Sequence, residues 1–373
     1  MKLEGLRVVD LSVFLPGPYL SLAFADHGAE VIKVEQPGEG DPGRHIGLSD
    51  GPSTVFFRNL NRGKKSVVLD LKTSRDRERL LELADTADVF IEAFRPGVVA
   101  RLGVDYATLS ARNPRLVYCS ISAFGQDGPY RLRPAHDLAV EALGGALSIN
   151  LGADDRPAMP GIVAADMLAS LQALSGVLMA LLRRERTGRG DYLDIAMHDA
   201  TLAAVPNGLG PTFTEGRQPV PKEERSWGGS AFYRLYETQD GRHLALGGQE
   251  IKFVRNLLNA LGRPDFVPLC EQGPGPHQRP LMAYLEGVFR EKPLSHWIEW
   301  FKPLDVCFAP VNTLPEALDD EHAAFREMVL TGPDGRRHIA PAIRFQDEPA
   351  RPVLREPGLG EHNGEFFPDP PGR

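Results

Sequence analysis

The chain has 373 residues and a formal net charge of −8, with 42% hydrophobic and 25% charged residues. This composition is globular and excludes a disordered or fibrous protein, and the length suggests two domains or more. The acidic balance argues against a nucleic-acid binder, because phosphate contact needs a basic face. Three scattered cysteines, Cys119, Cys270 and Cys307, fit neither a disulfide framework nor a zinc motif and favour a reducing compartment.

The first third of the chain alternates short apolar runs with segments of helical spacing. The segment 16–28 begins with Pro and ends with Gly, as helices commonly do, and a charged helix is expected to end near Ala84. Repeated strand–helix–strand units predict a parallel sheet covered by helices, although they do not give the strand order. Strands are expected at 6–12, 29–35, 65–71, 87–94 and 115–125.

A long helix is expected from about Asp166 to Arg186, followed by a strand at 191–197. Its longest uncharged stretch, Met167 to Leu182, is shorter than the roughly 20 residues that cross a bilayer, which favours a buried core helix. The N-terminus shows no basic region followed by a long apolar run, so no secretory signal is expected. We therefore expect a cytoplasmic protein with neither a membrane nor a nucleic-acid partner.

The second half of the chain suggests a smaller domain. Pro, Gly and mixed charges dominate at 206–227, which predicts a linker, and two β-runs beyond it are separated by a turn typical of a hairpin. Helices are expected at 252–261, 279–290 and 293–302, and the Pro-rich segment from about Pro333 is expected on the surface. We expect a large domain at 1–205, a linker at 206–227, a small domain at 228–330 and a return to the large domain at 331–373.

Several well-known motifs are missing from the sequence. There is no GxGxxG after the first strand and no GxxxxGK[ST], so the usual glycine loop for a nucleotide cofactor is not supported. There is no GxSxG, no HExxH and no histidine pair at metal-ligand spacing, so no metal site is expected. His198-Asp199 lacks a third ligand nearby, and we interpret it as a polar surface pair.

Three acid–base candidates, His136, Asp166 and Glu250, stand at predicted loop-to-helix junctions. The N-terminus of a helix carries free N–H groups and partial positive charge, which can stabilise a developing oxyanion. The alternative is structural, because Asp137 and Asp166 are typical N-caps and a glutamate in a first turn merely complements the helix dipole. The residues alone leave both interpretations open.

Basic residues in the first third could hold anionic groups of a ligand. In an acidic protein such a local basic stretch weakly suggests a phosphate-bearing ligand, while the ordinary alternative is a solvated surface. The residues concerned are Arg62 with its neighbours Lys64 and Lys65, and Lys72, Arg95 and Arg101.

Longer motifs carry a resemblance to a known family. The opening GLRVVDLS…PGPYLSLAFADHGAEVIKVEQPGEGDPGR resembles the family III CoA-transferases, as do LNRGKKSVVLDLK, ADVFIEAFRPGVVARLG, NPRLVYCSISAFGQDGPY and ERTGRGDYLDIAMHDA. DVCFAPV near Pro310 and LGEH at 359–362 extend the likeness over nearly the whole chain in the same order.

The resemblance implies a large Rossmann-like domain built from both chain ends, with a smaller α+β domain inserted between them. It also implies an interlocked homodimer whose active sites form between the large domain of one chain and the small domain of the other. The substrate would be an acyl-CoA thioester, so that CoA belongs to the substrate and no separate cofactor is needed. Lys72 and Arg101 match CoA contacts of the family, with Arg62 and Arg95 as weaker matches, and a role in lipid metabolism follows.

Within the family, the sequence is most similar to the α-methylacyl-CoA racemase branch. There a histidine placed as His136 and an aspartate placed as Asp166 act as two bases, and a glutamate placed as Glu250 supports the histidine. Transferases commonly carry Tyr in place of His136 and a glycine run in the crossover region, where this chain has only Gly228-Gly229. Two departures from the racemase pattern are the segment 167–170, where glycines are usual, and Asp127, where Thr or Ser is common.

Epimerisation at carbon 2 of a 2-methylacyl-CoA requires two bases on opposite faces of an enolate intermediate. N–H groups at the start of a helix could donate hydrogen bonds to the enolate oxygen. His136 would serve one face and Asp166 the other, with Asp166 protonated when His136 is the base. The alternative is a CoA-transferase in which Asp166 attacks the thioester to form an anhydride and His136 only shapes the pocket. A third class, a CoA-ester binding protein without catalysis, is disfavoured by the retained His, Asp and Glu.

Overall fold

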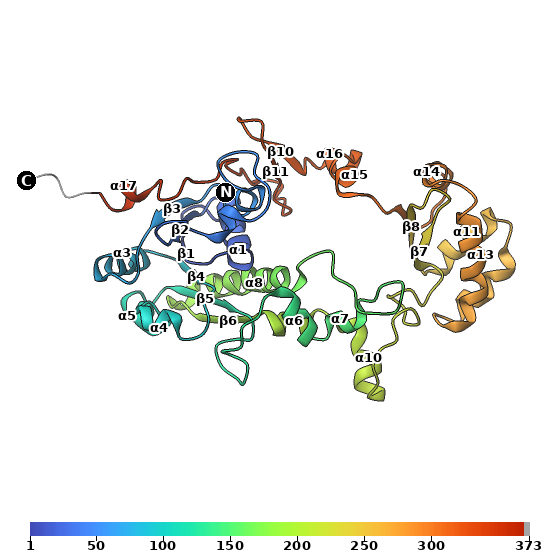
Figure 1. Cartoon of the computed structure of the whole chain (residues 1–373), viewed down its shortest axis with the longest axis horizontal. Helices are drawn as coiled ribbons and strands as arrows, with labels where there is room; N and C mark the ends of the chain where they lie inside the picture. The colour runs from blue at the N-terminus through green and yellow to red at the C-terminus, as the bar shows by residue number, and fades with distance from the viewer. Residues whose placement is uncertain (369–373) are drawn as a thin grey trace, which may run out of the picture. The chain divides into compact units, whose positions relative to one another are not determined.

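The structure, a computed structural model, describes residues 1–368 and divides into two compact units (Figure 1). The first unit combines 1–146, 160–204 and the chain from 321 onward, and the second combines 147–159 and 205–320. The segment 206–227, expected as a linker, contains helix α10 (Pro206–Glu215) and belongs to the second unit. The chain rejoins the first unit at Glu321, ahead of the expected boundary at 331.

A six-stranded parallel sheet forms the centre of the first unit and confirms the expected α/β class. The strand order is β3-β2-β1-β4-β5-β6, so the direction of winding reverses between β1 and β4. Val8 of β1 pairs with Val31 of β2 on one side and with Val89 of β4 on the other. The strands are β1 (Arg7–Asp10), β2 (Glu30–Glu35), β3 (Lys65–Val68), β4 (Val89–Glu92), β5 (Val117–Ser122) and β6 (Tyr192–Ala196).

Alternate residues of each strand face opposite sides of this sheet, as the two-residue period requires. Val8 packs in the core beneath α1 and α8, whereas its neighbour Val9 packs in the core beneath α3 and α5. Both faces are therefore covered, which explains why the strands are apolar throughout. The helices are α1 (Pro16–Asp26), α3 (Ser74–Asp85), α5 (Tyr106–Arg112) and α8 (Ala164–Thr187).

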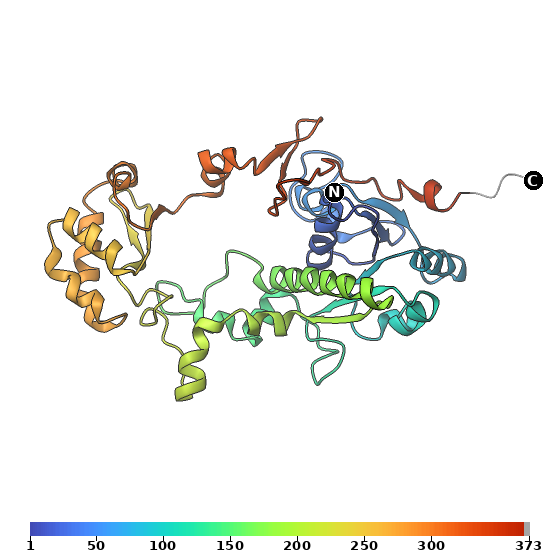
Figure 2. The same cartoon turned by 180° about the vertical axis from the view of Figure 1, so that it is seen from behind.

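Helix α8 runs along one face of the sheet (Figure 2). It presents a buried stripe of small residues to the sheet. The stripe consists of Ala165, Ala169, Ala173 and Val177, whose four-residue spacing keeps them on one helix face. By length and composition alone α8 could cross a membrane, but this buried stripe shows it as a core helix of the first unit. Its other side exposes Leu171, Leu178, Met179 and Leu182.

The C-terminal segment covers the open edge of the sheet at β3. The N–H of Ser66 donates to Nδ1 of His362 at 3.1 Å, and the N–H of Val68 donates to Oδ1 of Asn363 at 2.8 Å. In return the N–H of His362 donates to the carbonyl of Ser66 at 2.9 Å. The edge strand thus has its hydrogen-bonding groups paired by a segment nearly 300 positions away in the sequence, as the Ser66–His362 separation of 296 shows.

The second unit is built on a three-stranded antiparallel sheet in the order β7-β8-β9. β7 (Tyr233–Glu237) and β8 (His243–Gly247) form the hairpin expected from the sequence, and β9 (Phe308–Pro310) adds beside β8. The main helices, which pack their apolar faces in a common core with these strands, are α11 (Ile251–Ala260), α13 (Arg279–Phe289) and α14 (Leu294–Phe301).

Shorter elements complete the described chain. In the first unit these are α2 (Val55–Asn61), α4 (Val98–Leu102), α6 (Asp137–Leu143), α9 (Met197–Ala203), α16 (Glu321–Phe325), β10 (Val329–Thr331), β11 (Arg337–Ile339) and α17 (Asn363–Phe366). In the second unit they are α12 (Val267–Glu271) and α15 (Leu314–Leu318), while α7 (Ala146–Ile149) spans the boundary between the two units.

Candidate active site

A cavity of about 210 Å³ lies at the carboxyl ends of the parallel strands in the first unit. Its walls include Phe14 after β1, Phe94 and Arg95 after β4, and Ser122 at the end of β5. Because β1 and β4 flank the point where the strand order reverses, this is the crevice in which doubly wound sheets bind ligands. The sheet topology therefore selects this cavity as the candidate active site.

Two of the three predicted acid–base residues, His136 and Asp166, line this one cavity. His136 occupies the N-cap position of α6 but makes no capping hydrogen bond with its side chain. Its ring is exposed and meets the ring of Phe14 edge-on, with centroids 6.1 Å apart. The imidazole is thus held by a ring contact and keeps its nitrogens for other partners.

Asp166 is not an N-cap, contrary to the structural alternative considered from the sequence. Val163 occupies that position, and Asp166 is the third residue of α8. The start of α8 is capped instead by carboxylates of α6, since the N–H of Ala164 donates to Oε1 of Glu141 at 3.0 Å and the N–H of Asp166 donates to Oδ1 of Asp137 at 3.1 Å. The Asp166 carboxyl group therefore does not cap the helix.

The same caps restrict a second expectation, which named N–H groups at a helix start without specifying the helix. The N–H groups at the start of α8 were candidates to receive an enolate oxygen, yet those of Ala164 and Asp166 bond to Glu141 and Asp137. The N–H of Met167 donates to the carbonyl of Val163. Since these donors are occupied, this helix end cannot serve as the oxyanion site in the observed arrangement.

The capping carboxylates change the acidity of Asp166. Burial, followed by the negative charges of Asp137 and Glu141, raises the pKa of Asp166 to about 7. Burial also raises the pKa of Glu141. Ionising all three carboxyl groups around one helix end is unfavourable because their negative charges repel each other. Asp166 can therefore be either protonated or ionised near neutral pH.

A buried polar network underlies the loop that carries Phe14. The Nζ of Lys33 lies 2.7 Å from Oδ2 of Asp41, with both side chains buried. The other oxygen of Asp41 accepts the N–H of Phe14 at 3.3 Å. Phe14 has φ of 63°, a left-handed conformation that is strained for a bulky residue. Because Asp41 accepts the N–H of Phe14, the buried Lys33–Asp41 pair helps to hold this conformation, in which Phe14 lines the cavity.

A second buried carboxyl supports the neighbouring loop after β4. Oε2 of Glu92 accepts the N–H of Phe94 at 2.8 Å, and burial raises the pKa of Glu92 to about 7. Phe94 lines the cavity, so Glu92 fixes one of its walls from below.

Glu250 belongs to the second unit, where it is exposed at the N-cap position of α11 without a side-chain capping bond. Its carboxylate is thus not committed to the helix end. The support of His136 by Glu250 remains a prediction.

The four predicted CoA contacts fall into two groups. Lys72, Arg95 and Arg101 are exposed near the carboxyl ends of β3 and β4, and Arg95 also lines the cavity. Arg62, in contrast, is buried and makes a bidentate pair with Asp26, with Nε–Oδ1 at 2.9 Å and Nη2–Oδ2 at 2.5 Å. The prediction of Arg62 as a phosphate contact is therefore wrong, because its guanidinium is already used inside the core.

Sequence reasoning missed several residues of the site. The spacing of Asp137 and Glu141 by four residues places both on one helix face and could have signalled their joint role. Arg131 and Arg133, which lie just before His136 in the sequence, also line the cavity. Within the described residues there is no group of three side chains able to hold a metal ion.

Comparisons with known proteins agree with this architecture. The family model for CoA-transferase family III matches residues 3–363. Alpha-methylacyl-CoA racemase of Homo sapiens is 33% identical, over 98% of this chain and 93% of that protein. Acetyl-CoA:oxalate CoA-transferase of Acetobacter aceti is 34% identical, over 88% of this chain and 85% of that protein. The crystal structure of a CAIB/BAIF family protein from Brucella suis matches with a TM-score of 0.84 at 30% identity, covering 98% of each chain.

The chain belongs to CoA-transferase family III, an enzyme family that acts on acyl-CoA. Relatives of similar identity include both racemases and CoA-transferases. The choice between these two reactions therefore depends on the residues of the site.

Proposed function

We propose that this protein epimerises carbon 2 of a 2-methylacyl-CoA thioester by proton transfer between His136 and Asp166. The observation that carries the proposal is that both side chains line one cavity at the switch point of the sheet, with the pKa of Asp166 raised to about 7. A two-base reaction requires one group that accepts a proton while the other donates one. A carboxyl group that is half protonated near neutrality meets that need, whereas a nucleophile would be better served by a fully ionised one.

In one direction of the reaction, neutral His136 removes the proton from carbon 2. The C–H electron pair moves into the thioester as an enolate, and the imidazole becomes an imidazolium. Protonated Asp166 then gives its proton to the opposite face of carbon 2, and the carboxylate remains. The reverse direction starts from this imidazolium–carboxylate state, so protons and charge balance over the two half-reactions. We assign stabilisation of the imidazolium to Glu250.

A second candidate function is CoA transfer, favoured by the arginines that line the cavity, Arg95, Arg131 and Arg133, which could hold a free carboxylic acid. Ionised Asp166 would attack the thioester carbonyl, expelling the CoA thiolate and leaving a mixed anhydride. The thiolate would then attack the aspartyl carbonyl, releasing the first carboxylate and leaving an aspartyl-CoA thioester. The acceptor carboxylate would displace the thiolate to give a second anhydride. Attack of the thiolate on the acceptor carbonyl of that anhydride would form the new acyl-CoA and free the Asp166 carboxylate. This route requires an added carboxylic acid, and the epimerisation does not.

The test is proton NMR of the purified protein with (R)-2-methylacyl-CoA in D₂O without any acceptor acid. Loss of the carbon-2 proton signal with formation of both epimers is expected. If no exchange occurs but CoA moves to an acid once one is supplied, the transferase assignment replaces the epimerase. If neither occurs across a panel of 2-methylacyl thioesters, the site binds CoA esters without catalysis.

We further propose that the active form is a homodimer. The exposed apolar side of α8, with Leu171, Leu178, Met179 and Leu182, is the kind of surface that a second chain covers. Light scattering coupled to size exclusion should give twice the chain mass of 40.9 kDa. A Leu178→Lys/Leu182→Lys variant should shift that mass towards the monomer, and an unchanged monomeric mass in the wild type would refute the proposal.

A further inference from the structure

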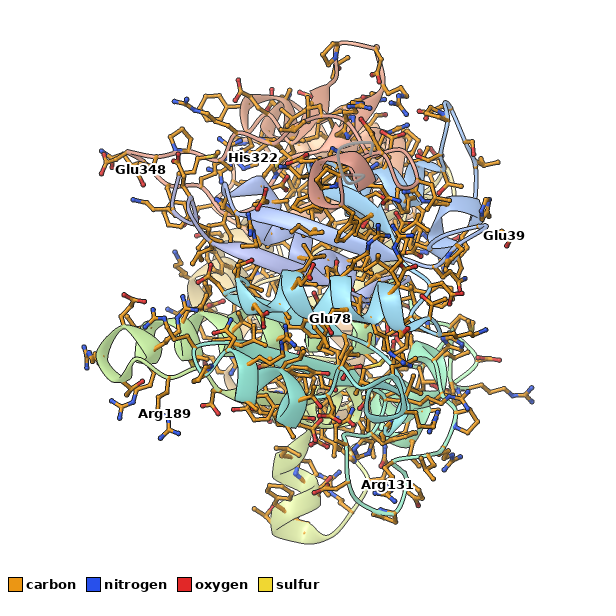
Figure 3. The ribbon with its side chains drawn as sticks, turned by 90° about the vertical axis from the view of Figure 1, so that its left-hand side faces the viewer. Glu39, Glu78, Arg131, Arg189, His322 and Glu348 are labelled. Carbon is orange, nitrogen blue, oxygen red and sulfur yellow. The ribbon has the colours of Figure 1, made fainter. Side chains whose placement is uncertain are left out.

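Two of the three arginines that line the cavity lie on one loop, and neither has an acidic partner among the described residues. Arg131 and Arg133 lie on the loop between β5 and α6, where Figure 3 labels Arg131, and both line the same cavity as His136 and Asp166. Within the part of the chain that the structure describes, neither guanidinium forms an ion pair or a side-chain hydrogen bond with an acidic residue. Other arginines of this unit, such as Arg62 with Asp26 and Arg184 with Asp88, are paired.

The loop that carries these arginines is supported by aromatic contacts. The ring of Tyr130 packs against Phe124 with centroids 5.7 Å apart, and the guanidinium of Arg133 lies 5.4 Å from the centre of the Tyr130 ring. The N–H of Arg133 also donates to the carbonyl of Tyr130 at 2.8 Å. A ring contact orients the guanidinium without neutralising its charge, so Arg133 remains available for an anion.

Neither arginine of this loop forms an ion pair with the reacting carboxyl in the described structure. Burial, Asp137 and Glu141 all raise the pKa of Asp166. A guanidinium in contact with that carboxyl would lower its pKa. The two guanidinium groups are therefore not used to hold the carboxyl at which the proton is transferred.

The phosphates of CoA are an unsuitable partner for these two side chains. The long pantetheine arm separates the phosphates from the thioester, whereas Arg131 and Arg133 share a cavity of about 210 Å³ with the groups that act on the thioester. The far end of a short acyl chain, in contrast, lies only a few bonds from the reacting carbon. Arginine matches the planar, two-oxygen geometry of a carboxylate especially well.

We propose that Arg131 and Arg133 bind a carboxylate at the far end of the acyl chain, so that the thioesters used by this site are those of dicarboxylic acids. The proposal rests on the proposed acyl-CoA chemistry of the cavity and adds the class of acyl group. It also concerns binding, which is measurable without turnover.

The test compares dissociation constants, measured by isothermal titration calorimetry, for glutaryl-CoA, valeryl-CoA and CoA alone. The two thioesters have the same chain length and differ in a terminal carboxylate against a methyl group. We expect the wild type to bind glutaryl-CoA about tenfold or more tightly than valeryl-CoA, as a charge-assisted bidentate contact would give. The Arg131→Gln/Arg133→Gln variant should lose this preference while its affinity for CoA alone stays the same.

Two control variants make the result specific. Arg189→Gln removes an exposed arginine on the turn that leads into β6, at the amino end of that strand and away from the cavity, and should keep the preference (Figure 3). Arg101→Gln removes an exposed, predicted CoA contact that does not line the cavity, and should weaken all three ligands alike. Melting temperatures would show that each variant is folded.

Equal affinity of the wild type for the two thioesters would overturn the proposal. It would also be overturned if the double variant lost affinity for CoA alone as much as for glutaryl-CoA, since the arginines would then hold phosphate. Failure of carbon-2 exchange in D₂O would refute the proposed epimerisation and leave this binding comparison intact.

Discussion

The main-chain N–H of Asp166 donates a hydrogen bond to Oδ1 of Asp137, 3.1 Å away, so the start of one helix is capped by a carboxylate from another. The contact holds a negative charge beside the carboxyl group that we assign to proton transfer. Asp137 thereby acts as a positioning residue with an electrostatic effect on Asp166. Two of our predictions follow from this relationship.

Replacing Asp137 with asparagine should move the pH dependence of exchange. The amide oxygen can still accept the N–H of Asp166, but the charge that helps to raise its pKa is gone, so the pKa should fall from about 7. For the direction in which protonated Asp166 is the acid, the decline of exchange rate at high pH should therefore shift to lower pH. Rates from deuterium incorporation at pH 5 to 9 would show this, and an unmoved profile would contradict the role assigned to Asp137.

Asp166→Asn should abolish exchange but stabilise the fold at neutral pH. The folded-state pKa of about 7 lies above the value of about 3.9 for an unfolded chain, so the folded protein binds more protons between these pH values. The stability that this group contributes at low pH is then lost as the pH rises through that window. The melting temperature of the variant relative to wild type should increase from pH 4 to pH 8. The difference in stability should change by on the order of 4 kcal/mol, which is about 1.4 kcal/mol for each unit between the two pKa values.

The matched control for that measurement is Asp347→Asn, which changes an exposed aspartate of the same unit. Its difference from wild type should be the same at both pH values. A parallel trend in the two variants would show that general charge, and not burial of Asp166, causes the effect.

His136→Ala should reduce carbon-2 exchange by about 10²–10⁴-fold, the usual contribution of a positioned general base. The imidazole is exposed and contacts the Phe14 ring, so its removal should leave folding and CoA-ester affinity nearly unchanged. Exchange by NMR and binding by calorimetry would be measured on the same preparation. Lost binding with an unchanged rate constant for bound substrate would assign His136 to the pocket wall.

Arg62 and Arg101 should respond in opposite ways to the same substitution. Arg62→Gln leaves buried Asp26 without its partner and should destabilise the protein by about 3–5 kcal/mol, with little effect on the CoA affinity of the folded fraction. Arg101→Gln alters an exposed side chain and should instead weaken CoA binding at an unchanged melting temperature. Denaturant titration and calorimetry would separate the two effects.

The architecture of the first unit was largely predictable because its strands alternate with helices of clear period. The hairpin of β7 and β8 was also predicted, from its turn residues. The segment 206–227 was not, since Pro and Gly suggest a loop, yet α10 begins at Pro206 and includes Pro211. Pro206 stands in the first turn of this helix, where a proline is tolerated, and Gly208 is the buried residue of α10.

The sequence also predicted His136 and Asp166 as site residues, and the structure brings both to one cavity, but the sequence did not predict the acidic groups around Asp166. Asp137 meets Asp166 across a separation of 29 positions, and Arg62 meets Asp26 across 36. A single sequence does not show which acidic residue a distant arginine will find, so buried Arg62 could not be told from exposed Arg101. The strained φ of Phe14 likewise has no sequence signature, because the residue is not a glycine.

The pairing of β3 with His362 and Asn363 has a consequence for how the protein is made. The strand is synthesised early, but the residues that cover its edge leave the ribosome only near the end of translation. Until then the nascent sheet exposes an unpaired edge that can recruit strands from other chains. Once they are synthesised, His362 and Asn363 pair with β3 and so prevent strands of other chains from pairing with it. This protection begins only after the intervening unit has been made.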